Sequence, residues 1–204
     1  MTGWLPLYLR SRRVPPAASA SAAAVAAVAA GWAGLAGRAE VHLGLAALTV
    51  ALAAAPLVPT LAADDADLER TAALRWPPRR ALHLVACAAF VAGLLIAARL
   101  LGADFGPAGQ IVRNAAGMVG LLGLGVAAVG TGYAWQLPFV WAAVQCLWPV
   151  PDGPAWRQAL LWLVQPADSR TAAIIAGALL LAGTAAYASR VGPRVAPAEA
   201  TMGQ

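Results

Sequence analysis

The sequence contains no lysine, and all 14 of its basic residues are arginine. Charged residues make up only 11% of its 204 positions, whereas hydrophobic residues make up 61%. Such a low share of charge excludes a water-soluble globular domain of ordinary composition, in which about a quarter of the residues are charged. The net charge of +5 comes from arginines that lie between apolar runs, so it indicates membrane topology rather than nucleic-acid binding.

Residues suited to catalysis or metal binding are also scarce. The two histidines, His42 and His83, have no partner ligands at metal-binding spacing, and Cys87 and Cys146 fall in separate apolar runs, which favours free thiols over a disulfide. The sequence lacks the zinc-protease, hydrolase-elbow and phosphate-loop motifs, and no acidic residue lies at the centre of an apolar run. We therefore expect no catalytic residue, no metal and no cofactor bound by this chain, and an intramembrane enzyme is the weakest functional hypothesis.

The sequence instead has long apolar runs. A membrane-spanning helix needs about 20 predominantly apolar residues, and most of these runs reach that length. The first run is interpreted as an uncleaved span rather than a cleaved signal, because five further runs follow it. We expect an all-α polytopic membrane protein with one transmembrane domain, 1–204, and six spans at 17–37, 43–62, 81–101, 112–132, 134–150 and 171–189.

Arginine placement orients these predicted spans. Arginines cluster before the first run, between the second and third, and after the last, and short arginine-rich loops face the cytoplasm. Both termini are then cytoplasmic, and the arginine- and alanine-rich composition indicates a bacterial cell membrane. The orienting residues are Arg10, Arg12, Arg13, Arg70, Arg75, Arg79, Arg80, Arg190 and Arg194.

Three short segments outside the spans also have helical signals. Residues 4–13 suit either a short helix that lies in the inner membrane interface or a plain basic segment that marks the cytoplasmic side, and the sequence favours neither alternative. Residues 155–165 are apolar but too short to span, which indicates a re-entrant or interfacial helix on the outer side. Residues 65–76 carry acidic residues first and arginine last, as a short cytoplasmic helix prefers, and Pro77 and Pro78 are expected to end it. This helix is either a solvated connector or a docking surface, and composition leaves the two equal.

The fourth run carries small residues at spacings of three and four. Such a face allows two helices to approach closely in lipid. Packing within one chain is favoured over a subunit interface. The residues are Ala116, Gly120, Gly123, Ala127 and Gly130. For Arg99 and Arg113, which lie near the ends of two runs, snorkelling towards the interface is favoured over contact with a substrate.

Several stretches of the chain resemble the permease subunits of actinobacterial ATP-binding-cassette (ABC) exporters of type 2. The similar stretches are LYLRSRR at 7–13, DLERTAALRWPPRRALH at 67–83, VRNAAGMVGL at 112–121 and AWQLP at 134–138. The similarity covers most of the chain diffusely, and none of these strings is a diagnostic motif. The short loops and the short fifth run depart from the family pattern.

The resemblance implies six spans with both ends inside, a coupling helix between the second and third spans, and outer half-helices before the sixth. It implies a non-catalytic exporter subunit that pairs with a second permease copy in the lipid bilayer and binds a separate ATPase, which carries ATP and Mg. The expected ATPase contacts are Leu68, Glu69, Arg70, Ala72 and Arg75. The alternative function is a membrane scaffold or assembly protein without transport.

Overall fold

The computed structural model describes residues 4–62, 76–147 and 153–189, and this part of the chain consists mainly of helices joined by turns and loops, with one isolated bridge between Glu40 and Asp104. Five helical segments are long and apolar enough to cross a membrane, which indicates a membrane-embedded protein. They are Val14–Leu35, Leu43–Leu61, Trp76–Leu101, Ala108–Val129 and Arg170–Ser189. The predicted fifth span is only a 12-residue helix, Gln136–Leu147.

The connections that the structure describes are short. Prolines end the second span irregularly, because a proline inside a helix lacks the N–H donor of a regular turn, and Pro59 lies within a 3₁₀ segment there. In chain order, the elements are α1 (Trp4–Ser11), α2 (Val14–Leu35), α3 (Leu43–Ala54), η1 (Ala55–Leu61), α5 (Trp76–Ala97), η2 (Ala98–Leu101), α6 (Ala108–Val129), α7 (Gln136–Leu147), α8 (Ala155–Leu160) and α9 (Arg170–Ser189).

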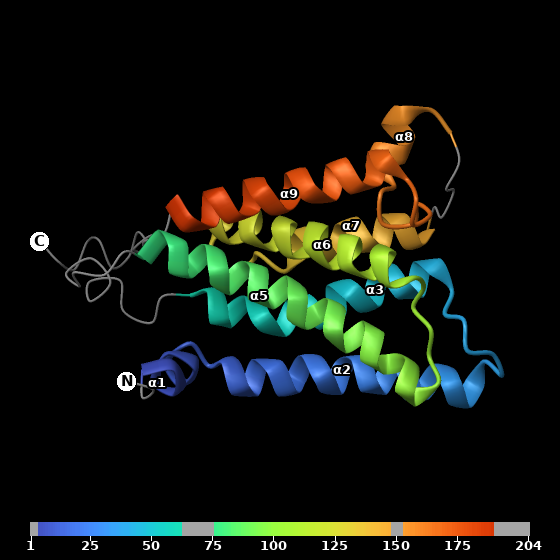
Figure 1. The fold of residues 1–204 in the computed structure, drawn as a ribbon, viewed down its shortest axis with the longest axis horizontal. Coiled ribbons are helices and arrows are strands. Elements are labelled where there is room, and N and C mark those ends of the chain that lie inside the picture. The colour runs from blue at the N-terminus through green and yellow to red at the C-terminus, as the bar shows by residue number, and fades with distance from the viewer. Residues whose placement is uncertain (1–3, 63–75, 148–152, 190–204) are drawn as a thin grey trace, which may run out of the picture.

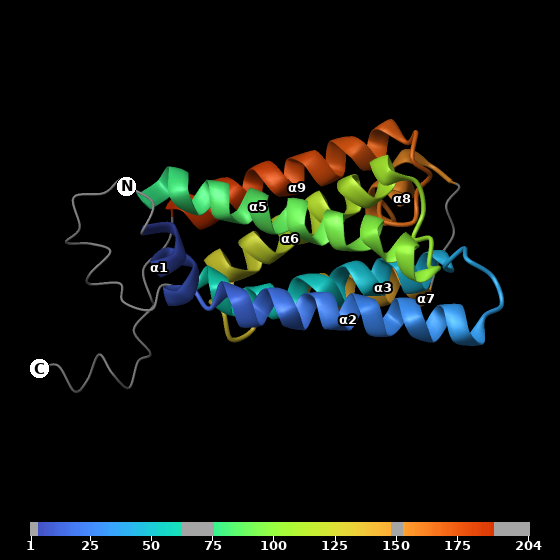
Figure 2. The same ribbon diagram turned by 60° about the horizontal axis from the view of Figure 1, so that its bottom comes forward.

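The long helices lie side by side in an elongated bundle (Figure 1). α2 and α9 form two of its margins, and α6 lies inside, in contact with α3, α5, α7 and α9. Figure 2 shows that α1, the start of α5 and the end of α9 lie at one end, which we call the α1 end. The opposite end, the α8 end, holds α8 and the connections α2–α3 and α5–α6.

Several helix limits differ from the sequence-based expectations. The described part of α5 begins at Trp76 and includes Pro77 and Pro78, five residues before the predicted start at 81. Residues 65–75 of the predicted cytoplasmic helix lie outside the described residues, so its proline stop remains a prediction. α6 begins at Ala108, earlier than the predicted 112, because Arg113 is accommodated inside the helix.

Candidate functional site

The predicted small-residue face of α6 lies partly against α9 of the same chain. A Cβ atom built on Gly120 would come within 2.5 Å of the Leu179 backbone, and one built on Gly123 would lie 3.0 Å from the Gly183 carbonyl oxygen. A Cβ atom on Gly183 would in turn overlap the backbone of Gly120. The glycines therefore let the two backbones touch, a contact that any side chain would prevent.

The other members of this face are placed differently. Ala116 and Ala127 are half-buried, and Gly130 ends α6 with a positive φ of 79° and nothing within 4 Å of a built Cβ. Two glycines that the spacing did not single out make close contacts instead. Gly117 lies against the Trp162 ring, and a Cβ atom on Gly125 would lie 2.9 Å from the Ala134 carbonyl oxygen. The sequence carries no signal for the tryptophan partner, because that residue is distant in the chain.

Arg113 is buried near the start of α6 and holds the segment that follows α8. Its Nη1 donates to the Pro166 carbonyl at 2.7 Å and its Nη2 to the Gln165 carbonyl at 2.7 Å. The next residue, Asn114, accepts from Arg113 Nε at 3.1 Å and donates to the Leu163 carbonyl at 2.7 Å. The planar guanidinium suits two adjacent acceptors. Arg113 is 8% exposed, so the expectation that it snorkels outwards was wrong.

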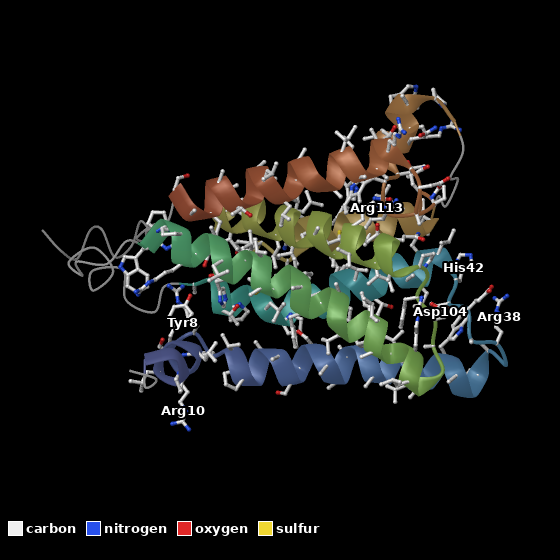
Figure 3. The ribbon with its side chains drawn as sticks, in the orientation of Figure 1. Tyr8, Arg10, Arg38, His42, Asp104 and Arg113 are labelled. Carbon is white, nitrogen blue, oxygen red and sulfur yellow. The ribbon has the colours of Figure 1, made fainter. Side chains whose placement is uncertain are left out.

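The segment 161–165 is buried in the bundle by these bonds (Figure 3 labels Arg113 beside it). The backbone N–H of Leu163 also donates to Gln145 Oε1 of α7 at 2.9 Å, and the Trp162 side chain is fully buried. The predicted element 155–165 is thus a six-residue helix, α8, followed by a stretch that returns into the bundle and joins α6 to α7. Its role in the structure is to fill the space beside the short α7.

Polar side chains also close the α1 end. The last carbonyls of the η1 region are acceptors: Tyr187 Oη donates to the Leu61 oxygen at 3.1 Å, and Arg12 Nη1 donates to the Ala62 oxygen at 2.6 Å. These bonds matter because a proline-containing 3₁₀ segment leaves carbonyls without helical partners. They connect η1 to α9 and to the turn between α1 and α2.

His83 belongs to the same group of contacts. Its Nε2 lies 3.0 Å from Thr60 Oγ1, and its ring meets the Tyr8 ring edge-on at 6.0 Å between centroids. Figure 3 places Tyr8 and Arg10 at this end, and Arg10 points away from the bundle. The contacts give His83 a packing role between α1, η1 and α5.

A hollow of about 520 Å³ opens at the α8 end, between the α2–α3 and α5–α6 connections. The connections are joined by two backbone hydrogen bonds, from Val41 N to the Asp104 oxygen at 2.9 Å and from Asp104 N to the Ala39 oxygen at 2.8 Å. Arg38, His42 and Asp104 lie together there (Figure 3). The lining is Arg38, Glu40, Val41, His42, Leu43, Arg99, Asp104, Phe105, Gly106, Pro107 and Gln110.

Arg99 braces one wall of this hollow. It donates from Nε to Asp104 Oδ1 at 3.1 Å and from Nη2 to the Gly106 carbonyl at 2.6 Å. The same Asp104 oxygen accepts from Gly106 N at 2.9 Å. The ion pair is 41% exposed on both sides, so it contributes little to stability and mainly fixes the shape of the loop.

The predicted ATPase contacts are not part of this geometry. Leu68, Glu69, Arg70, Ala72 and Arg75 lie outside the described residues. Among the residues that the structure describes, no three His, Cys, Asp or Glu side chains come together as a metal site would require. Comparisons of the chain with family models, curated proteins and solved structures found no match.

Proposed function

We propose that this chain is the transmembrane subunit of an ATP-driven ABC exporter of type 2. Two copies, or this chain and a similar one, would enclose the substrate pathway, and a separate ATPase would bind the arginine-rich face at the α1 end. The chain itself carries no catalytic step, since ATP and Mg belong to the partner.

One observation supports this proposal most. A short helix and a buried return, α8 and 161–165, come directly before the last long helix. Outer half-helices before the sixth span are what the resemblance to type 2 permeases implies. The short α1 before the first long helix, at the same end as the termination of α9, suits the same plan.

Coupling to the ATPase is assigned to the segment 65–76. In this proposal Leu68, Glu69, Ala72 and Arg75 share one helical face, with Arg70 beside them, because their spacings are three and four. ATP-driven closure of the ATPase would move this face and, through it, the start of α5.

The first test asks whether an ATPase binds at all. The full chain is purified in mild detergent from its own host, and copurifying nucleotide-binding subunits are sought. We expect an ATPase whose hydrolysis rate changes when the chain is present. Consistent absence of such a subunit would replace the exporter with the scaffold alternative.

A charge swap then tests the coupling segment. The double variant Glu69→Arg with Arg75→Glu should lose ATPase binding or stimulation while retaining insertion. The matched control swaps charge at the α8 end, Asp168→Arg with Arg170→Glu, two exposed positions. Equal ATPase stimulation by both double variants would reject the coupling role.

Orientation is tested by cysteine labelling in a variant without Cys87 and Cys146. A membrane-impermeant reagent added outside should modify Ala155→Cys at the α8 end and spare Asp67→Cys. Labelling of position 67 instead would show that the topology is inverted and that the proposed ATPase face lies outside the cell.

A further inference from the structure

The hollow at the α8 end has hydrogen-bonding groups that bond no residue in the described part of the chain. Gln110 is only 7% exposed as a whole, its side chain bonds no described residue, and its amide atoms are not among the buried ones. Its amide lies in the wall of the hollow, since the Oε1 atom would be 3.4 Å from a Cβ atom built on Gly106. Because these amide atoms open into the hollow and bond no described residue, they are available to a ligand there.

Other donors face the same space. α6 begins here after Pro107, which supplies no side-chain cap. Gln110 N and Ile111 N donate to the Pro107 carbonyl, so the amides of Ala108 and Gly109 are the ones open to an anion. His42 accepts from Gly44 N through Nδ1 at 3.2 Å, so a neutral imidazole ring carries its proton on Nε2. Its Nε2–H remains available in the lining of the hollow.

The charged side chains that line the hollow comprise one ion pair and two groups without an ion-pair partner among the described residues. Arg99 and Asp104 neutralise each other across 3.1 Å. Arg38 rests on the Trp32 ring at 5.5 Å, which leaves its guanidinium N–H groups available, and Glu40 has no ion pair within the described part of the chain. One free cation and one free anion, two residues apart, match a ligand that carries both signs.

The surroundings favour a lipid. The hollow lies where α2, α3, α5 and α6 begin or end, the level at which spans meet head groups. Leu35 and Leu100, at the ends of α2 and η2, are 92% and 89% exposed. These leucines do not line the hollow, but they stand one and three residues along the chain from the lining residues Arg99 and Arg38. Exposed leucines at this level suit acyl chains below a bound head group.

We propose that this hollow binds a zwitterionic phosphate–amine head group of the phosphoethanolamine type. The phosphate is held by Arg38, the Gln110 amide and the first amides of α6, and the ammonium group is held by Glu40. The site does not depend on the transport role, because neither ATP nor a second subunit contributes to it.

The test measures lipid binding to the full chain in detergent by native mass spectrometry. Phosphatidylethanolamine should bind more tightly than phosphatidylglycerol, which lacks the amine. Arg38→Gln and Gln110→Leu should each weaken binding of phosphatidylethanolamine roughly tenfold, the loss expected for a charge-assisted or buried hydrogen bond. Glu40→Gln should abolish the preference between the two lipids.

A matched control is Arg157→Gln. Arg157 also lies over a tryptophan ring at the α8 end, 5.7 Å from Trp156, but it does not line the hollow. Equal weakening by Arg157→Gln and Arg38→Gln overturns the proposal, as does an unchanged lipid preference in Glu40→Gln. A competition experiment with soluble glycerophosphoethanolamine distinguishes a soluble ligand from a membrane lipid. If the soluble compound displaces phosphatidylethanolamine, the ligand is a soluble head-group compound. If it does not displace the lipid, the ligand is the membrane lipid.

Discussion

Helices α2 and α6 have the same length and similar small-residue composition, yet the bundle uses them in opposite ways. Each contains 22 residues rich in alanine and glycine. Four residues of α2 are buried, against thirteen of α6, so only α6 is a core helix. The difference shows that small residues permit close packing but do not bring it about.

The partners explain the difference. Gly120 and Gly123 of α6 meet the α9 backbone, whereas Gly31 and Gly34 of α2 have nothing within 4 Å of a built Cβ. α6 also carries Arg113 and Asn114, which bond three backbone carbonyls of the segment after α8. The buried hydroxyl of Ser21 in α2 has no partner in the described structure. Close packing in α6 thus depends on a facing glycine and on polar anchors.

The largest expected effect is that of Gly120→Leu. A leucine there would push the α9 backbone away, and overpacking of this kind costs about 1–3 kcal/mol or more, so we expect loss of folded protein or a large fall in melting temperature. The measurement is thermal unfolding of the detergent-solubilised chain, followed by size-exclusion chromatography.

The matched control is Gly31→Leu in α2. It should leave the melting temperature of the monomer nearly unchanged, because no described residue occupies that space. If it instead abolished assembly, the exposed face of α2 would be a contact with a second subunit. Comparable destabilisation by both variants would remove the contrast between the two helices.

Arg113→Ala is expected to have the next largest effect. The change strands the Gln165 carbonyl inside the bundle and removes the bond to the Pro166 carbonyl at its edge, so we expect a loss of about 2 kcal/mol in unfolding free energy. Proteolysis of the 161–169 region should speed up as the segment detaches. Arg113→Lys should recover only part of this loss, because an ammonium group cannot present the planar fork. Full rescue by lysine would mean that charge alone holds the segment.

The smallest effect is predicted for Ser21→Ala in α2. Removing a buried hydroxyl that has no hydrogen-bond partner should change stability by less than about 0.5 kcal/mol, or raise it slightly. Asn114→Ala, by contrast, deletes the bond to the Leu163 carbonyl and should cost about 1 kcal/mol. Thermal unfolding of both variants provides the comparison, and a larger loss in Ser21→Ala would show that α2 has a polar contact of its own.

Much of the helical plan could be predicted, because it depends on local composition. Apolar runs of about 20 residues located the long helices, and the weakness of the fifth run agreed with the 12-residue α7. Helix starts were less predictable. Arg113 suggested a boundary at 112, although its carbonyl partners let it sit one turn inside α6.

The candidate sites were harder to predict from the sequence than the fold. The hollow joins residues of two connections, around Arg38 and around Asp104, that are distant in the chain, and the spacing of residues carries no signal for such a meeting. Arg99 was singled out from the sequence, but Gln110 was not, because a lone glutamine in an apolar run indicates no chemistry until its surroundings are known.

The sequence by itself determined an all-helical chain with several segments apolar enough to cross a membrane, since a helix satisfies its own backbone hydrogen bonds and its composition decides its affinity for lipid. Only the tertiary structure decided that α6 is central and α2 marginal, that Arg113 turns inwards, and that a polar hollow lies between the α2–α3 and α5–α6 connections. Those outcomes depend on which backbone lies against each small or polar residue. Such contacts are set by the packing of all the helices and not by the sequence of any one of them.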